Sequence, residues 1–220
     1  MKQIKMQFAM DGAASRTLEQ ALKMVGDVAA YVDIVEVGTS FVLRYGMEAV
    51  KAMKQAFPEK EILADMKIMD GGYHNTALGC HAGGDIVTIL GVSDAATIRG
   101  AIKACHDNGK QAMVDLICVQ DKARVIALCE AVGADYICAH SGVDVQQAGQ
   151  NPYADLSEII GLVKTCKVAV AGGLDEQTAE DICKLGPDVV IVGGAIHKAA
   201  DCGQVAANIR AIIDRVAQSL

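Results

Sequence analysis

Short runs of β-branched residues alternate with amphipathic segments along the chain, and this alternation restricts the fold more than any other feature. The ends of eight such runs lie about 21 to 32 residues apart, the length of one strand–helix unit. The expected strands are Ile4–Met10, Val32–Val37, Glu61–Asp65, Asp85–Ile89, Gln111–Leu116, Tyr136–Ala139, Lys167–Ala171 and Val189–Val192. The expected helices are Thr17–Ala29, Glu48–Ala56, a short one starting near Gly72, Ala95–His106, Asp121–Ala131, Asp155–Val163, Glu176–Leu185 and Val205–Val216.

A series of this kind can close into a barrel or form an open, doubly wound sheet. An open dinucleotide-binding sheet favours G-x-G-x-x-G after its first strand, but this chain has Asp11-Gly12-Ala13-Ala14 there. The even spacing, the eight strands and the length of 220 residues favour closure, and no break in composition divides the chain. The sequence therefore predicts an α/β fold with a single (β/α)8 TIM-barrel domain over residues 1–220.

Composition restricts the partners and the compartment. The net charge is −7 and Lys and Arg form no dense cluster, which argues against a nucleic-acid partner. No apolar run approaches the roughly 20 residues that cross a bilayer, and the apolar start is too short for a signal peptide. The eight cysteines include no C-x-x-C pair, so we expect free thiols in the cytoplasm instead of disulfides or a zinc site.

Carboxylates end four of the expected strands. They are Asp11, Glu36, Asp65 and Asp115, and Thr88 ends a fifth strand. In a barrel of this type the C-terminal strand ends carry the functional groups. A single acid there is commonly a helix cap, but four on one rim repel each other unless a cation lies among them. Oxygen ligands at this density favour Mg2+ over zinc, so the sequence predicts a Mg2+ site.

The segment from Asp65 to Asp70 is the most specific local pattern. Residues two apart on a strand face the same side, so Asp65 and Lys67 are expected to point together into the barrel mouth. A lysine between carboxylates stays charged and can stabilise an oxyanion, although a structural ion-pair cluster is the alternative interpretation. His140 ends the sixth expected strand, where an imidazole can transfer protons or simply pack.

Two glycine pairs follow the last two expected strands. They are Gly172-Gly173 and Gly193-Gly194. Glycine lets a backbone approach a ligand closely, and the loops after strands seven and eight are the recurring phosphate site of such barrels. Tight turns explain the glycines too, but their position favours phosphate. His197 follows the second pair, and we expect it at the surface.

These segments together resemble the orotidine 5'-phosphate decarboxylase suprafamily. The similar stretches are Val32–Thr39, Ala64–Gly72, Val87–Gly91, His140–Gly149, Val170–Gly173 and Val190–Ile196, which run in order along nearly the whole chain. The resemblance implies a barrel of the ribulose-phosphate-binding type, a Mg2+ cofactor and a phosphorylated sugar as substrate. It also implies a homodimer in which Asp70 reaches the site of the neighbouring subunit.

The resemblance further implies a role for each matching residue. Glu36 and Asp65 match metal-binding carboxylates, Lys67 matches the lysine beside an enediolate, Asp11 lies near the sugar hydroxyls, and His140 takes part in proton transfer. The glycine pairs Gly172-Gly173 and Gly193-Gly194 match phosphate-binding turns, and Thr39 and Thr88 lie in matching stretches that face the substrate.

Two branches of the suprafamily compete for this chain. A decarboxylase branch, which acts on 3-keto-L-gulonate 6-phosphate, usually has His-Arg-Ser-Arg-Asp after strand six and Gly-Arg-Ser after strand eight. This chain has His140-Ser141-Gly142 and Gly193-Gly194-Ala195 there, and it has Asp115 instead of a glutamate. These residues follow the synthase branch, whose members commonly have Ile-Thr-Lys where this chain has Ile196-His197-Lys198.

The synthase branch implies a reversible, metal-dependent aldol reaction. D-ribulose 5-phosphate condenses with formaldehyde through a 1,2-enediolate to give D-arabino-hex-3-ulose 6-phosphate. His140 is the favoured base, with Asp115 and Lys67 as rivals. The alternatives are the decarboxylase, another phosphosugar lyase or epimerase, and a binding protein that has lost catalysis.

Overall fold

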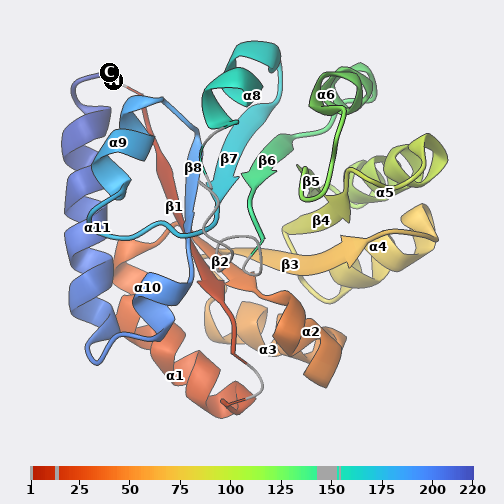
Figure 1. The fold of residues 1–220 in the computed structure, drawn as a ribbon. Coiled ribbons are helices and arrows are strands. Elements are labelled where there is room, and N and C mark those ends of the chain that lie inside the picture. Colours follow the sequence, from red (N-terminus) through yellow and green to blue (C-terminus); the bar gives the residue numbers. More distant parts are fainter. Residues whose placement is uncertain (1, 13–14, 143–152, 154) are drawn as a thin grey trace.

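The strands form a closed parallel barrel, as the sequence predicts. The computed structural model describes residues 2–12, 15–142, 153 and 155–220. Each strand pairs with the next one along the chain, and the last pairs with the first (Figure 1). The strands are β1 (Lys5–Met10), β2 (Ile34–Val37), β3 (Glu61–Ile68), β4 (Ile86–Leu90), β5 (Gln111–Asp115), β6 (Tyr136–His140), β7 (Lys167–Ala171) and β8 (Val189–Val192).

Helices follow the strands and surround the barrel (Figure 1). They are α1 (Leu18–Val28), the short 3-10 helix η1 (Ala29–Tyr31), α2 (Thr39–Tyr45), α3 (Met47–Ala56), α4 (Gly72–His81), α5 (Ala95–Asp107), α6 (Lys122–Ala131), α8 (Leu156–Leu162), α9 (Ala179–Lys184), α10 (Gly194–His197) and α11 (Cys202–Ala217). The expected helices are present, and α2 and α10 are additional. No helix in the described part of the chain is long and apolar enough to span a membrane.

Strand β3 is longer than predicted, because it continues past Asp65 to Ile68. Its pairing with β4 shifts between Ala64 and Ile68, and Lys67 has a φ angle of 45° within this irregularity. A positive φ is uncommon for a residue with a side chain, and such backbone irregularities often redirect a side chain at a functional site. The shift therefore sets the direction of the Lys67 side chain.

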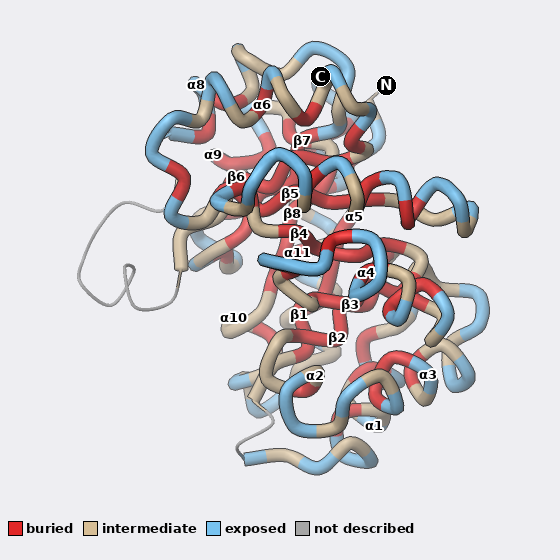
Figure 2. Tube along the Cα trace, turned by 90° about the vertical axis from the view of Figure 1, so that its right-hand side faces the viewer, coloured by how far each residue is buried: buried red, intermediate tan, exposed pale blue. Residues whose placement is uncertain are grey.

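The core has two parts. Figure 2 colours buried residues red, and these lie along the strands and at intervals along the helices. The outer part lies between the strands and the helices. The inner part fills the barrel with residues from every strand, including Leu63, Met113 and Tyr136. The eight cysteines are free thiols, and Cys80, Cys105, Cys129, Cys138 and Cys183 are buried. The packed interior leaves the C-terminal strand ends to form the site.

Candidate active site

A cavity of about 720 Å³ lies at the C-terminal ends of the strands. The predicted site residues that line it are Asp11, Glu36, Thr39, Asp65, Lys67, Thr88, Asp115, His140, Gly172, Gly173, Gly193 and Gly194. They come from all eight strands or the turns directly after them. The cavity is of the size that small-molecule sites usually have.

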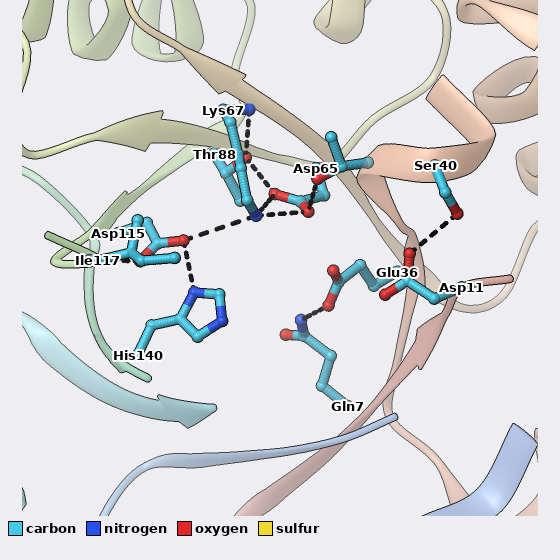
Figure 3. A network of polar contacts seen from close by, with 11 residues as sticks. Gln7, Asp11, Glu36, Ser40, Asp65, Lys67, Thr88, Asp115, Ile117 and His140 are labelled. Atoms are coloured by element: carbon cyan, nitrogen blue, oxygen red, sulfur yellow. Dashed lines mark hydrogen bonds and ion pairs between the residues drawn. The ribbon is translucent and has the colours of Figure 1, made fainter. Parts of the chain in front are cut away.

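Asp65 is at the centre of the polar contacts in this cavity (Figure 3). Lys67 Nζ donates to both of its carboxylate oxygens, at 2.9 Å and 2.7 Å. Thr88 Oγ1 donates to Asp65 Oδ1 at 2.8 Å, and Thr39 Oγ1 donates to Oδ2. Burial alone would raise the pKa of Asp65, but the ammonium of Lys67 and the two hydroxyls outweigh it and lower that pKa. Asp65 is therefore a fixed, ionised carboxylate.

Lys67 is held as a cation. Its Nζ lies 2.7 Å from Asp65 Oδ2 and 3.7 Å from Asp115 Oδ2. Its backbone N–H donates to Thr88 Oγ1 at 2.9 Å, which supports the left-handed backbone at this position. Burial opposes its charge, but the attraction of Asp65 and Asp115 is stronger and raises the pKa of Lys67 well above its usual range. A lysine that keeps its proton can stabilise an oxyanion but cannot serve as the base.

Asp115 and His140 form a pair beside this cluster (Figure 3). His140 Nδ1 lies 2.8 Å from Asp115 Oδ2, and Asp115 Oδ1 accepts a hydrogen bond from the backbone N–H of Ile117 at 2.9 Å. Because an ionised carboxylate only accepts hydrogen bonds, Nδ1 must carry a proton. A ring with its single proton on Nδ1 has a free lone pair on Nε2, and such an arrangement can orient a general base. Of the three rival bases, His140 has the fitting geometry.

Glu36 is a buried carboxylate that forms no ion pair with any residue the structure describes. Its Oε2 accepts a hydrogen bond from Gln7 Nε2 at 2.6 Å. Burial raises the pKa of Glu36 well above its usual range, and the charges of Asp65 and Asp11 raise it further. The site thus has more negative charge than Lys67 balances, and a divalent cation would relieve this excess.

The donor set of Glu36 and Asp65 fits Mg2+. Mg2+ prefers oxygen ligands and is usually held by one or two carboxylates, with waters and substrate oxygens completing its shell. Within the described residues no group of three or more His, Cys, Asp or Glu side chains is placed to hold a metal. The described residues thus form no site in which protein side chains supply most of the ligands of a metal. A Mg2+ site with two carboxylate ligands matches the residues present.

The two glycine pairs lie at another part of the same cavity. Gly172 and Gly173 both have positive φ angles, 109° and 69°, which residues with side chains rarely adopt. Gly193 and Gly194 begin the turn into α10, where His197 and Lys198 also line the cavity. His197, which we expected at the surface, is half-buried, and it follows Ile196 at the end of α10 as part of the cavity lining.

Asp70 lies apart from the other predicted residues. It is exposed after β3 and does not line the cavity, and its Oδ1 accepts a hydrogen bond from the backbone N–H of Gly71 at 2.7 Å. Residues 143–149 of the stretch that resembles the suprafamily lie outside the described residues. Within this subunit, Asp70 is thus not part of the polar cluster around Asp65.

Sequence reasoning missed several residues of the cavity. Gln7 was detectable, because it alternates with Ala9 and Asp11 on one face of a buried strand. Ser40 does not line the cavity, but its Oγ donates to Asp11 Oδ1 at 3.1 Å from the first turn of a helix that the sequence did not predict. Lys198 also lines the cavity; the sequence places it in the Ile196-His197-Lys198 segment but gives it no role.

Comparisons with known proteins agree with this geometry. Residues 5–209 match the model of the Orotidine 5'-phosphate decarboxylase / HUMPS family. A 3-hexulose-6-phosphate synthase of Bacillus subtilis (strain 168) is 40% identical over 210 residues, which cover 96% of this chain and 99% of the relative. The crystal structure of a 3-hexulose-6-phosphate synthase from Salmonella typhimurium has a TM-score of 0.93 at 45% identity, covering 97% of this chain and 100% of that chain.

A more distant solved structure has the same fold. It is a 3-keto-L-gulonate-6-phosphate decarboxylase from Vibrio cholerae, with a TM-score of 0.82 at 24% identity, and the match covers 98% of this chain and 99% of that chain. Likeness at this identity concerns the arrangement of the strands and helices and not the chemistry of the site.

Proposed function

The chain belongs to the Orotidine 5'-phosphate decarboxylase / HUMPS family, and we propose that it is a lyase that condenses D-ribulose 5-phosphate with formaldehyde. The product is D-arabino-hex-3-ulose 6-phosphate, and the reaction is reversible. The observation that carries the proposal is the Asp115–His140 pair, which faces the same cavity as the Lys67–Asp65 pair and the two glycine turns. The cavity thus combines a base, a fixed cation and a place for phosphate.

Glu36 and Asp65 would hold Mg2+ in this proposal. When bound, Mg2+ supplies a Lewis acid that stabilises negative charge on oxygen atoms of the substrate. Gln7 keeps the Glu36 carboxylate in place through its 2.6 Å hydrogen bond, and Thr39 and Thr88 do the same for Asp65. Partners of this kind commonly orient the ligands of a metal site.

Side chains of the protein move the proton and stabilise the negative charge that forms on the substrate. His140 Nε2 removes a proton from C1 of ribulose 5-phosphate, and Asp115 stabilises the imidazolium that forms. The ammonium of Lys67 stabilises the negative charge of the 1,2-enediolate. C1 then attacks the carbon of formaldehyde, a C–C bond forms, and the former carbonyl oxygen of formaldehyde takes the proton back from His140. No atom is lost, which fits a reversible aldol reaction.

Three further properties belong to the proposal. The chain acts as one barrel domain over residues 1–220 and works in the cytoplasm. Two copies form a homodimer, in which the exposed Asp70 reaches the neighbouring subunit's cavity. Asp70 does not line the cavity of its own subunit, which supports the homodimer. Its carboxylate is therefore available to the cavity of a neighbouring subunit.

Exchange of hydrogen at C1 tests the proton-transfer step. In D2O with Mg2+ and without formaldehyde, the enzyme is expected to replace one of the two C1 protons of ribulose 5-phosphate, which 1H NMR detects. The base is on one side of the cavity, so a single proton exchanges. Removing the metal with EDTA should stop the exchange, and added Mg2+ should restore it. Product formation without C1 exchange would contradict the role of His140 as the base. Exchange in the presence of EDTA would contradict the requirement for Mg2+.

A further inference from the structure

Arg16 connects the loop after β1 to the turn after β8. Its Nη2 donates to the backbone carbonyl oxygen of His197, and its Nη1 lies 3.4 Å from His197 Nδ1. Gly12 leaves room for this side chain, because a Cβ atom at Gly12 would lie 2.7 Å from Arg16 Nη1. The carbonyl oxygen of Arg16 in turn accepts a hydrogen bond from Arg44 Nη1 at 3.2 Å. The guanidinium thus contacts His197 through two of its nitrogens, and Arg44 contacts the backbone of Arg16.

This contact fixes the proton of the His197 ring. A guanidinium can only donate hydrogen bonds, so His197 Nδ1 has to accept, and the single proton of the neutral ring lies on Nε2. Burial lowers the pKa of His197, the charges of Arg16 and Lys198 lower it further, and Asp11 opposes them. His197 is therefore a neutral ring with an Nε2–H donor at neutral pH.

The same turn carries a cation. Lys198 lines the cavity with His197, Gly193 and Gly194, and its Nζ lies 3.6 Å from the position that a Cβ atom of Gly194 would take. Among the described residues, no carboxylate lies within ion-pair distance of Lys198. A neutral donor and an ammonium beside two glycines suit the oxygens of a phosphate group.

We propose that Arg16 orients His197 as an Nε2–H donor to the phosphate group of the substrate, which makes His197 a specificity residue for the phosphorylated end. This inference rests on the proposed function, since it concerns the substrate of the same cavity. Arg16 contacts His197 but does not line the cavity, so it is a positioning residue that acts through His197.

Phosphate binding and steady-state kinetics of four variants test the pair. The variants are His197→Ala, His197→Thr, Arg16→Met and the double variant Arg16→Met/His197→Ala, with His81→Ala as the control. His81 is an exposed histidine that hydrogen-bonds to Asn108 and is outside the cavity. Circular dichroism shows whether each variant is folded.

His197→Ala is expected to raise the KM for ribulose 5-phosphate and the Kd for inorganic phosphate by about tenfold, a larger change than in kcat. Arg16→Met should also raise both constants. The double variant should bind phosphate no more weakly than His197→Ala alone, because Arg16 acts through the ring. His197→Thr should restore part of the affinity, and His81→Ala should match the wild type. In 15N-edited NMR, wild-type His197 should be the Nε2–H tautomer, and Arg16→Met should give a mixture.

The opposite results would overturn the inference. These are an unchanged phosphate Kd in His197→Ala, or losses in the double variant that equal the sum of the single losses. The Kd of inorganic phosphate and the NMR signature need no turnover. A failure of the pair is thus distinguishable from a failure of the proposed aldol reaction, in which the wild type would bind phosphate but form no product.

Discussion

Replacing Asp65 by asparagine is expected to lower turnover by about a thousandfold or more while the barrel remains folded. The amide removes one of the two carboxylates proposed for Mg2+ and the main partner of Lys67, which lies 2.7 Å away. It also replaces one of the two oxygens that accept hydrogen bonds from Thr39 and Thr88 by an NH2 donor. The change thus weakens the metal site and the placement of the ammonium together.

Stability should change much less than activity in Asp65→Asn. The substitution removes the ion pair with Lys67, but Lys67 keeps Asp115 at 3.7 Å, and Glu36 loses a repulsive neighbour. Because the pKa of Asp65 is lowered in the folded state, its stabilisation exists above its unfolded pKa and is lost as the pH falls through the folded value. The two effects oppose each other at neutral pH, so we expect the Tm to shift by only about 2–4 °C.

The control for Asp65→Asn is Asp107→Asn, an exposed carboxylate that pairs with Lys103 outside the cavity. It should retain turnover within about twofold of the wild type, because exposed ion pairs contribute little. Steady-state assays and thermal melts measure both variants. Turnover of Asp65→Asn within tenfold of the wild type would remove Asp65 from the mechanism.

Asp115→Asn is expected to lower the rate of C1 proton removal by about 10³- to 10⁴-fold. The asparagine amide can donate to His140 Nδ1, and the ring would then carry its proton on Nε2, where the base is needed. His140→Gln should lose a comparable factor, because it removes the ring itself. The double variant should be little worse than either single variant, since the two residues act as one unit.

A second histidine–aspartate pair provides the control for this prediction. His106 Nε2 lies 3.1 Å from Asp135 Oδ2 outside the cavity, so His106→Gln removes the same kind of contact. It should leave C1 exchange close to the wild-type rate. If His106→Gln lost as much as His140→Gln, or if Asp115→Asn kept most of its exchange, the base would have to be another group.

The sequence predicts the barrel well because its signals are local and repeated. Strand–helix alternation depends on side-chain pattern, and the strand ends fall within a few residues of the expected positions. The carboxylates Asp11, Glu36, Asp65 and Asp115 are found together because parallel strands place their ends on one rim. Membership of the suprafamily follows from motifs at these same ends.

The remaining features depend on contacts that a pattern does not contain. The irregularity of β3 at Lys67 arises from its pairing with β4, and no local rule places a lysine at φ 45°. Arg16 and His197 are 181 residues apart and meet because β1 and β8 are neighbours in the closed barrel. The place of His197 depends on α10, a helix too short to give a periodic signal.

In the proposed reaction, this cavity makes an enediolate of ribulose 5-phosphate and adds it to formaldehyde. The most direct measurement compares turnover with Mg2+ on two substrates: ribulose 5-phosphate with formaldehyde, and 3-keto-L-gulonate 6-phosphate. Asp115, Gly142 and Gly194 follow the synthase pattern, so aldol condensation should be the faster reaction. Faster release of CO2 would contradict this account, and no turnover of either substrate would assign the cavity to another phosphosugar.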